Sequence, residues 1–242
     1  MIRINKFLAQ CNLGSRRQVE TLITSGKIKV NGSIVTELSS QVDIGKDIVE
    51  FEGKTLTSNK DNFYIMLNKP IKYLTTSKDE FNRKTVYELI PDFGVHLFSV
   101  GRLDYMSEGL LIFTSDGDFA DKIIHPRYKL PKVYKVTIKG SLNDEQIQVL
   151  RDGVKIEGKL TSPAIVHIKK SNINSSVLKM TIFEGRKRQI RKMIKTVGSE
   201  VMELKRLQIG EVQLGKLPKG MWRPLKSWEV MSLINQSKKQ GK

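Results

Sequence analysis

The chain has 242 residues, with 42 Lys or Arg against 25 Asp or Glu, so its formal net charge is +17. This excess points first to nucleic acid as a partner and second to an anionic membrane surface. A hydrophobic share of 39 % argues against a wholly disordered chain, and the single cysteine, Cys11, excludes an intrachain disulfide and a Cys-rich zinc site. No apolar run approaches the roughly 20 residues of a membrane span, and the N-terminus lacks a signal peptide's apolar stretch. We therefore expect a cytoplasmic protein, without membrane association, that acts on nucleic acid.

Residues 1–53 predict a small module of two helices and a small sheet. Apolar residues spaced i, i+3, i+4 and i+7 predict a helix over 4–11. Ser15 begins a capping-box pattern at the start of a second helix. The dipeptide Asn31-Gly32 between two short apolar runs is typical of a hairpin. A further pair of strands, joined by a turn, is expected over 42–51.

Two arginines stand in an unfavourable place in this module. Arg16 and Arg17 fall in the first turn of the second helix, where the helix dipole disfavours cations. Contact with phosphate explains this placement, although a tolerated surface pair remains the alternative. The run RINKFLAQCNLGSRRQVETLITSGKIKVNG resembles the S4 RNA-binding domain. The resemblance implies that Arg16, Arg17 and Lys27 contact structured RNA.

The rest of the chain predicts a linker, a larger domain and a tail. Residues 54–62 are polar and aperiodic, which is typical of a linker. Residues 63–234 alternate strand-like runs with helices, which predicts a mixed domain and, with the first module, the α+β class. Residues 235–242 are polar and basic and predict a disordered tail. Within the larger domain, strands are expected over 63–67, 110–113, 133–138 and 177–183, and helices over 143–150 and 190–197.

Several familiar catalytic motifs are absent from the sequence. It has no GxGxxG, and the GxxxxGK spacing over 153–159 lacks the Ser or Thr that would hold Mg²⁺, because Leu160 stands there. The histidines His96, His125 and His167 are far apart and have no paired cysteines. We therefore predict neither a phosphate loop nor a metal site.

One aspartate and one basic run remain as candidates. Asp104 stands among apolar and small residues just before a predicted buried strand, which suits either a turn aspartate or a catalytic one. The basic run is Arg186, Lys187, Arg188, Arg191, Lys192 and Lys195, with only Glu184 nearby. Such a cluster needs an anion or abundant water.

The segment GRLDYMSEGLLIFTSDG is similar to the central motif of the pseudouridine synthases, in the branch that joins an S4 domain to a catalytic domain, the RsuA/RluB group. Residues 132–134 resemble the tyrosine motif of that family, and GRKRQIRKM resembles its basic motif. Together with LNKP, LKRLQIG and LPKGMWRPL, the match spans nearly the whole chain. Ser107 stands where Thr is usual, and Ile71-Lys72 replaces a position where Gly is common.

The resemblance implies isomerisation of a uridine to pseudouridine in ribosomal RNA, without a cofactor or metal. Asp104 matches the catalytic aspartate, and Arg191 matches its basic partner, expected to lower the pKa of that carboxyl. Tyr134 matches the tyrosine that stacks on the uracil, and Arg102 is a candidate for displacing the target base. Phosphate contacts are expected from Arg186, Lys187 and Arg188.

Two other functions remain open from sequence. One is a non-enzymatic S4-type RNA-binding or ribosome assembly factor, which the set Asp104, Tyr134 and Arg191 argues against. The other is an S4-fused RNA methyltransferase, which lacks a methyl-donor loop in this sequence. The segment LIFTSDGDFADKIIHP is more similar to the RluB-like members of the group, which act on large-subunit ribosomal RNA. We expect a monomer with no obligate protein partner.

Overall fold

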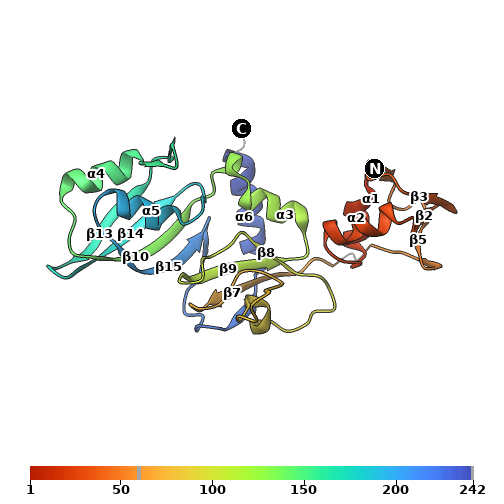
Figure 1. Cartoon of the computed structure of the whole chain (residues 1–242), viewed down its shortest axis with the longest axis horizontal. Helices are drawn as coiled ribbons and strands as arrows, with labels where there is room; N and C mark the ends of the chain where they lie inside the picture. The colour runs from red at the N-terminus through yellow and green to blue at the C-terminus, as the bar shows by residue number, and fades with distance from the viewer. Residues whose placement is uncertain (59–60, 241–242) are drawn as a thin grey trace. The chain divides into compact units, whose positions relative to one another are not determined.

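The computed structural model describes residues 1–58 and 61–240, which fold into two compact units, each with its own hydrophobic core (Figure 1). The first unit comprises Met1–Asn62 and Asp92–Leu97, and the second comprises Phe63–Pro91 and Phe98–Lys242. In the described residues, no helix combines the length and apolar character that a bilayer span requires.

The first unit contains the two predicted helices, α1 (Ile4–Gln10) and α2 (Arg16–Thr24). The capping box at α2 is confirmed, because Ser15 Oγ accepts from Gln18 N at 3.4 Å and Gln18 Oε1 accepts from Ser15 N at 2.8 Å. A four-stranded sheet has the order β3-β2-β5-β6, and β1 pairs separately with β4. The strands are β1 (Ile2–Arg3), β2 (Ile28–Val30), β3 (Ser33–Val35), β4 (Gln41–Val42), β5 (Val49–Phe51) and β6 (Lys54–Thr55).

The strand pair predicted over 42–51 is wrong. The two strands form, but β4 pairs with β1 and β5 pairs with β2. The carboxylate of Asp47 accepts from Asp43 N at 2.7 Å and from Asn31 Nδ2 at 3.0 Å. These bonds tie the connection to the β2–β3 turn, so the two strands diverge instead of forming a hairpin.

The predicted linker is also shorter than expected. Its first two residues form β6, which pairs with β5, and residues 59–60 lie outside the described residues. The first unit also includes Asp92–Leu97, far along the chain. Asn12 holds this segment, because its Nδ2 donates to Gly94 O at 2.8 Å and its Oδ1 accepts from His96 N at 2.6 Å.

The second unit is built on a mixed sheet that has nine strands in the described part of the chain. Its main order is β13-β14-β10-β15-β9-β7-β17, with β16 beside β15 and β8 beside β9. The β9–β15 pair is parallel, whereas the others are antiparallel. The strands are β7 (Tyr64–Lys69), β8 (Phe98–Val100), β9 (Glu108–Thr114), β10 (Lys132–Lys139), β13 (Ile165–Ser171), β14 (Ser175–Ile182), β15 (Val201–Ile209), β16 (Val212–Gln213) and β17 (Trp222–Pro224).

Helices gather beside two parts of this sheet (Figure 1). Two of them, α3 (Gly117–Ile124) and α6 (Ser227–Gln240), lie beside β8 and β9 and bury a core that includes Phe119 and Leu233. Of the other two, α4 (Asp144–Asp152) contacts β13, and α5 (Gln189–Thr196) contacts β15. Two short 3₁₀ helices are η1 (Val86–Leu89) and η2 (Pro126–Tyr128).

The GxxxxGK spacing does not form a phosphate loop. Its residues build a small hairpin of β11 (Lys155–Ile156) and β12 (Lys159–Leu160). The predicted disordered tail over 235–242 is wrong as far as Gln240, because α6 continues to that residue and buries Ser237. Residues 241–242 lie outside the described residues.

The parallel β9–β15 pair requires glycine at position 109. Gly109 has φ of +106°, and a Cβ there would overlap the carbonyl oxygen of Arg206 and lie 2.8 Å from its amide nitrogen. We predict that Gly109→Ala lowers the free energy of unfolding by about 3 kcal/mol or more, through strain and displacement of β15. Urea unfolding measures this.

Gly158→Ala is the matched control, since Gly158 also has positive φ but no atom within 4 Å of an added Cβ. It should cost only about 1–2 kcal/mol. Equal losses for both variants would show that the close approach of β9 to β15 does not matter.

Candidate active site

Asp104 lies in the turn between β8 and β9, where the sequence placed it. Its carbonyl oxygen accepts from Ser107 N at 2.9 Å, and Thr75 Oγ1 donates to Leu103 O at 2.9 Å. Lys72 adopts φ of +65°, a conformation that favours glycine, and its N–H donates to Tyr105 O at 2.7 Å. Lys72, at the place where glycine is common, therefore keeps a glycine-like backbone. The bonds from Thr75 and Lys72 hold the residues immediately before and after Asp104.

A buried lysine lies directly beneath this turn. Lys69, at the end of β7, is fully buried, and its Nζ donates to Pro70 O at 2.9 Å, Ser107 O at 2.8 Å and Asp104 O at 3.2 Å. Burial lowers the pKa of Lys69 to about 8, against the opposing charge of Asp104 and with a further lowering by Arg206. Sequence reasoning gave Lys69 no role, although a lysine closing an apolar strand before proline was a signal.

Arg191 lies near Asp104, and no ion pair joins the two within the described part of the chain. Its Nη2 donates to Met106 O at 2.7 Å and its Nη1 to Val201 O at 3.1 Å. Burial and the charge of Arg188 lower the pKa of Arg191, whereas the charge of Asp104 raises it. The guanidinium holds the backbone of the Asp104 turn against α5 and β15, and the role of Arg191 as basic partner of Asp104 stays a prediction.

A cavity of about 530 Å³ opens beside Asp104 in the second unit. It brings together most of the predicted site residues, and Asp104 is the one carboxylate among its described lining residues. Arg191 is not part of the lining. The predicted residues that line the cavity are Arg102, Asp104, Tyr134, Arg186, Lys187 and Arg188. Two further cations, Lys132 and Arg206, line it and were given no role from sequence.

One wall of the cavity is a face of the sheet. Lys132 and Tyr134 are two residues apart on β10, so their side chains point to the same face of the sheet. Arg206 on β15 is directly opposite Tyr134 in the strand register. Tyr134 is only 7 % exposed, and it contributes to the lining of the cavity.

Three buried polar atoms near the Asp104 turn have no hydrogen-bond partner among the described residues. They are Ser107 Oγ, Arg191 Nε and Arg206 Nη2. Buried polar atoms are normally paired, and exceptions gather at functional sites. Ser107 keeps the hydroxyl of the Thr that the family resemblance led us to expect, and this hydroxyl has no partner among the described residues.

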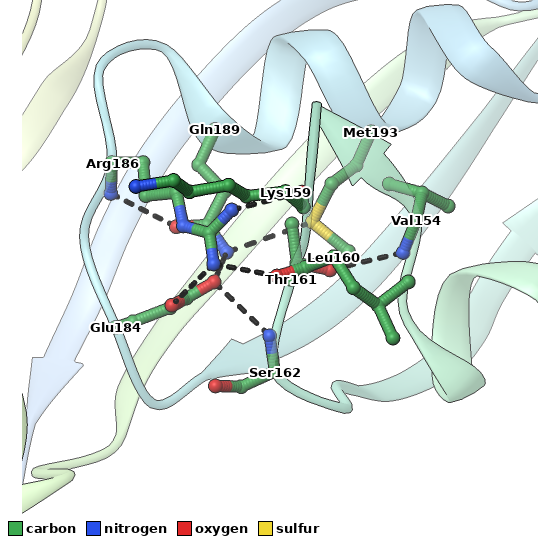
Figure 2. Close-up of polar contacts among 9 residues, drawn as sticks. All are labelled: Val154, Lys159, Leu160, Thr161, Ser162, Glu184, Arg186, Gln189 and Met193. Atoms are coloured by element: carbon green, nitrogen blue, oxygen red, sulfur yellow. Dashed lines mark hydrogen bonds and ion pairs between the residues drawn. The ribbon is translucent and has the colours of Figure 1, made fainter. Parts of the chain in front are cut away.

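Some cations of the basic run bind other groups of the protein, whereas the sequence predicted a run without such partners. Figure 2 shows Arg186 donating to the hairpin carbonyls Lys159 O at 3.0 Å and Leu160 O at 2.6 Å. It also forms an ion pair with Glu184 at 3.3 Å, and Glu184 accepts from Gln189 Nε2 at 2.9 Å (Figure 2). Arg186 therefore braces the β11–β12 hairpin against the loop before α5.

The neighbouring cations are of two kinds, one bound to a carboxylate of the protein and the others exposed at the cavity. Lys192 pairs with Glu157 at 2.5 Å, so the prediction of a wholly unpaired run is wrong. Lys187 and Arg188 are exposed at the cavity, and neither forms an ion pair within the described residues. Arg188 has φ of +55° and is the N-cap residue of α5.

In the first unit, Arg16, Arg17 and Lys27 are all exposed and form no ion pair in the part of the chain that the structure describes. The arginines begin α2, and Lys27 follows its end. At 1.5 Å per residue, roughly 14 Å of helix separates them. The three cations can therefore contact different phosphates rather than one.

Comparisons with known proteins show the family of the chain. The family model for RNA pseudouridylate synthases matches residues 63–196, and that for the S4 domain matches residues 2–49. The chain belongs to the RNA pseudouridylate synthase family. The S4 module and the α+β class predicted from sequence are confirmed for this enzyme.

Similar proteins cover the enzyme almost completely. An uncharacterized RNA pseudouridine synthase of Aquifex aeolicus is 42 % identical over 96 % of this chain and 94 % of its own. The Bacillus subtilis protein named ribosomal large subunit pseudouridine synthase B is 36 % identical over 96 % of both chains. A solved crystal structure of a pseudouridylate synthase has a TM-score of 0.70 at 31 % identity, over 96 % of this chain and 100 % of that one.

The buried ammonium of Lys69 should make the free energy of unfolding of the synthase depend on pH. Because the pKa of Lys69 is about 8 in the folded state, below its ordinary 10.5, the unfolded chain binds the proton more tightly between these values. Lys69 should therefore make the free energy of unfolding rise with pH from 8 to 10.5, by at most about 3 kcal/mol. Urea unfolding of wild type and Lys69→Met at pH 7.5 and 10 measures the difference. A difference that stays constant or falls with pH would contradict this.

Arg186 and Lys187 form a matched pair of neighbours with different predicted roles. Arg186→Met should lower the free energy of unfolding by about 1–2 kcal/mol, because two carbonyls lose their donor, and speed amide exchange in the β11–β12 hairpin. Lys187→Met should leave stability within about 0.5 kcal/mol but reduce the salt dependence of RNA binding by a slope of about 1. The reverse pattern would overturn the structural assignment of Arg186.

Proposed function

We propose that this enzyme isomerises a uridine of ribosomal RNA to pseudouridine, with Asp104 as the carboxylate that acts on the target nucleotide. The observation that carries the proposal is the single carboxylate in a cation-lined cavity of about 530 Å³, a volume within the usual range of small-molecule sites. The S4 domain and the similarity to a large-subunit synthase support ribosomal RNA, on the large-subunit side, as substrate.

The cavity suits a nucleotide extruded from the RNA. Flipping costs a few kcal/mol, and Arg102, exposed at the cavity, is placed to enter the gap that the base leaves. Tyr134 offers an aromatic ring against which the uracil can stack. The base then lies against the sheet while the sugar carbon C1′ lies beside Asp104.

Asp104 supplies the negative charge that the reaction needs. The N1–C1′ bond breaks, the uracil turns over, and a C5–C1′ bond forms. An ionised carboxylate can attack or stabilise the electron-poor sugar carbon during this exchange, as carboxylates do in glycoside hydrolysis. Substrate and product contain the same atoms, so we propose that neither a cofactor nor a metal takes part.

Arg191 acts in this proposal through the backbone. Its bonds to Met106 O and Val201 O fix the turn that carries Asp104. Its guanidinium also lies close enough for the charge of Asp104 to raise the pKa of Arg191, against the lowering by burial and by Arg188. Arg191 is therefore a positioning residue rather than a direct partner.

RNA is held outside the cavity by exposed cations of both units. In the catalytic unit these are Lys187 and Arg188, which lie at the cavity. In the S4 domain they are Arg16, Arg17 and Lys27. Arg186 contributes indirectly, because its guanidinium is bound to the hairpin. We propose that the enzyme acts in the cytoplasm as a monomer without an obligate protein partner.

Removal of the Asp104 charge tests this function. Asp104→Asn should lower the single-turnover rate of pseudouridine formation by at least about 10³-fold, with RNA affinity unchanged, because the amide keeps the shape but cannot act as a nucleophile. Digestion of large-subunit ribosomal RNA to nucleosides, followed by chromatography that separates pseudouridine from its isomer uridine, measures the product. Asp144→Asn, an exposed acid at the start of α4, is the matched control for the change in charge.

Unchanged modification by Asp104→Asn would end the role given to Asp104. Tight RNA binding by the wild type with no pseudouridine in any RNA would instead favour a non-enzymatic RNA-binding factor.

A further inference from the structure

Two cations at the floor of the cavity are not used by the proposed function. Arg206 is only 4 % exposed, and its Nε donates to Leu110 O at 2.7 Å. Its Nη2 is buried and has no partner among the described residues. A buried, unpaired guanidinium donor is costly, and this one belongs to a residue that lines the cavity.

Lys132 is the second of these cations. Its Nζ donates to Leu130 O at 2.9 Å, which uses one of the three donors of an ammonium. Burial and the charge of Arg206 lower the pKa of Lys132 to about 8. Neither Lys132 nor Arg206 forms an ion pair within residues 1–58 and 61–240. The fold therefore keeps two cations close together in a poorly solvated place without a carboxylate between them.

The position of the pair identifies which part of a nucleotide it meets. Arg206 is opposite Tyr134 in the strand register, and Lys132 is two residues from Tyr134 on the same face. The phosphates of a target nucleotide continue into the RNA on both sides, so they must stay at the mouth, near the exposed Lys187 and Arg188. Only the base, which is the free end of the nucleotide, can reach the floor.

We propose that Arg206 and Lys132 stabilise the negative charge that develops on the uracil ring during isomerisation. This inference rests on the proposed function and adds two residues to it. When the N1–C1′ bond breaks, both of its electrons remain on the base, and the charge spreads over N1, O2 and O4. Fixed donors in a site with little water stabilise such charge strongly.

The charge is transient and the electrons balance. After the base turns, C5 donates an electron pair to C1′ and forms the new bond, and the carboxylate of Asp104 is free again. The proton on C5 then leaves and N1 gains one, so the product is neutral and has the composition of the substrate. If the carboxylate first adds to the ring instead, the negative charge also appears on a ring oxygen, so the same two cations stabilise it.

The test compares substrates whose bases accept negative charge with different ease. Large-subunit ribosomal RNA is transcribed with uridine or with 5-fluorouridine, in which fluorine withdraws electrons and makes the departing ring a weaker base. Single-turnover consumption of the target nucleotide is followed by chromatography and mass spectrometry after nuclease digestion. The variants are Lys132→Met, Arg206→Gln and Arg206→Lys, with Lys135→Met as control, because Lys135 points to the opposite face of β10.

Lys132→Met and Arg206→Gln should each slow the reaction of uridine by about 100-fold or more, and that of 5-fluorouridine by at most about 10-fold. Arg206→Lys, which keeps the charge, should recover part of the loss. RNA affinity and its salt dependence should stay at wild-type values, and Lys135→Met should match wild type in rate.

Equal losses on the two substrates, or a loss of RNA affinity with a smaller salt dependence, would overturn the proposal, and the second result would assign the pair to a phosphate. If Arg206→Gln does not fold, Lys132→Met decides by the same comparison. Product formation by the wild-type enzyme is read in the same experiment, so failure of the proposed function itself is distinguished by the absence of any pseudouridine.

Discussion

The site depends on one buried ammonium group. Lys69 donates to three carbonyl oxygens, two of which belong to the turn that carries Asp104. An ammonium in this place costs desolvation energy, and its three bonds offset part of that cost only while the turn keeps its shape. Arg191 holds the same turn from the other side, through Met106 O. Backbone contacts therefore set the position of the turn, and the described residues form no ion pair with the Asp104 carboxylate.

The net charge of +17 serves different purposes at different depths. Exposed cations such as Arg16 and Lys187 are free of ion pairs in the described residues and suit phosphate, whose contacts give affinity but little sequence information. Arg186 and Lys192 bind other groups of the protein. Arg186 donates to the β11–β12 hairpin, and Lys192 pairs with Glu157. Lys69, Lys132 and Arg206 lie deepest, where solvent screening is weak and a charge acts most strongly on its neighbours.

Local signals were readable from the sequence, and long-range ones were not. The cap at Ser15 was predicted because it depends on residues three apart, and Asp104 and Tyr134 were found through motifs. The pairing of β4 with β1 was missed because it depends on Asp47 bonds to a distant turn. The burial of Lys69 and Arg206 was missed because three strands from separate parts of the chain, β7, β9 and β15, create their environment. The contacts of Arg191 to Met106 O and Val201 O were missed for the same reason.

The most direct measurement is a crystal structure of the Asp104→Asn enzyme bound to a large-subunit ribosomal RNA fragment that the wild type modifies. A uridine should be extruded into the cavity, with its base against Tyr134 and its C1′ about 3–3.5 Å from the side chain at position 104. Its phosphates should lie at the cavity mouth, near Lys187 and Arg188. A uridine that stays stacked in the RNA, or a phosphate at the floor beside Arg206, would contradict the account.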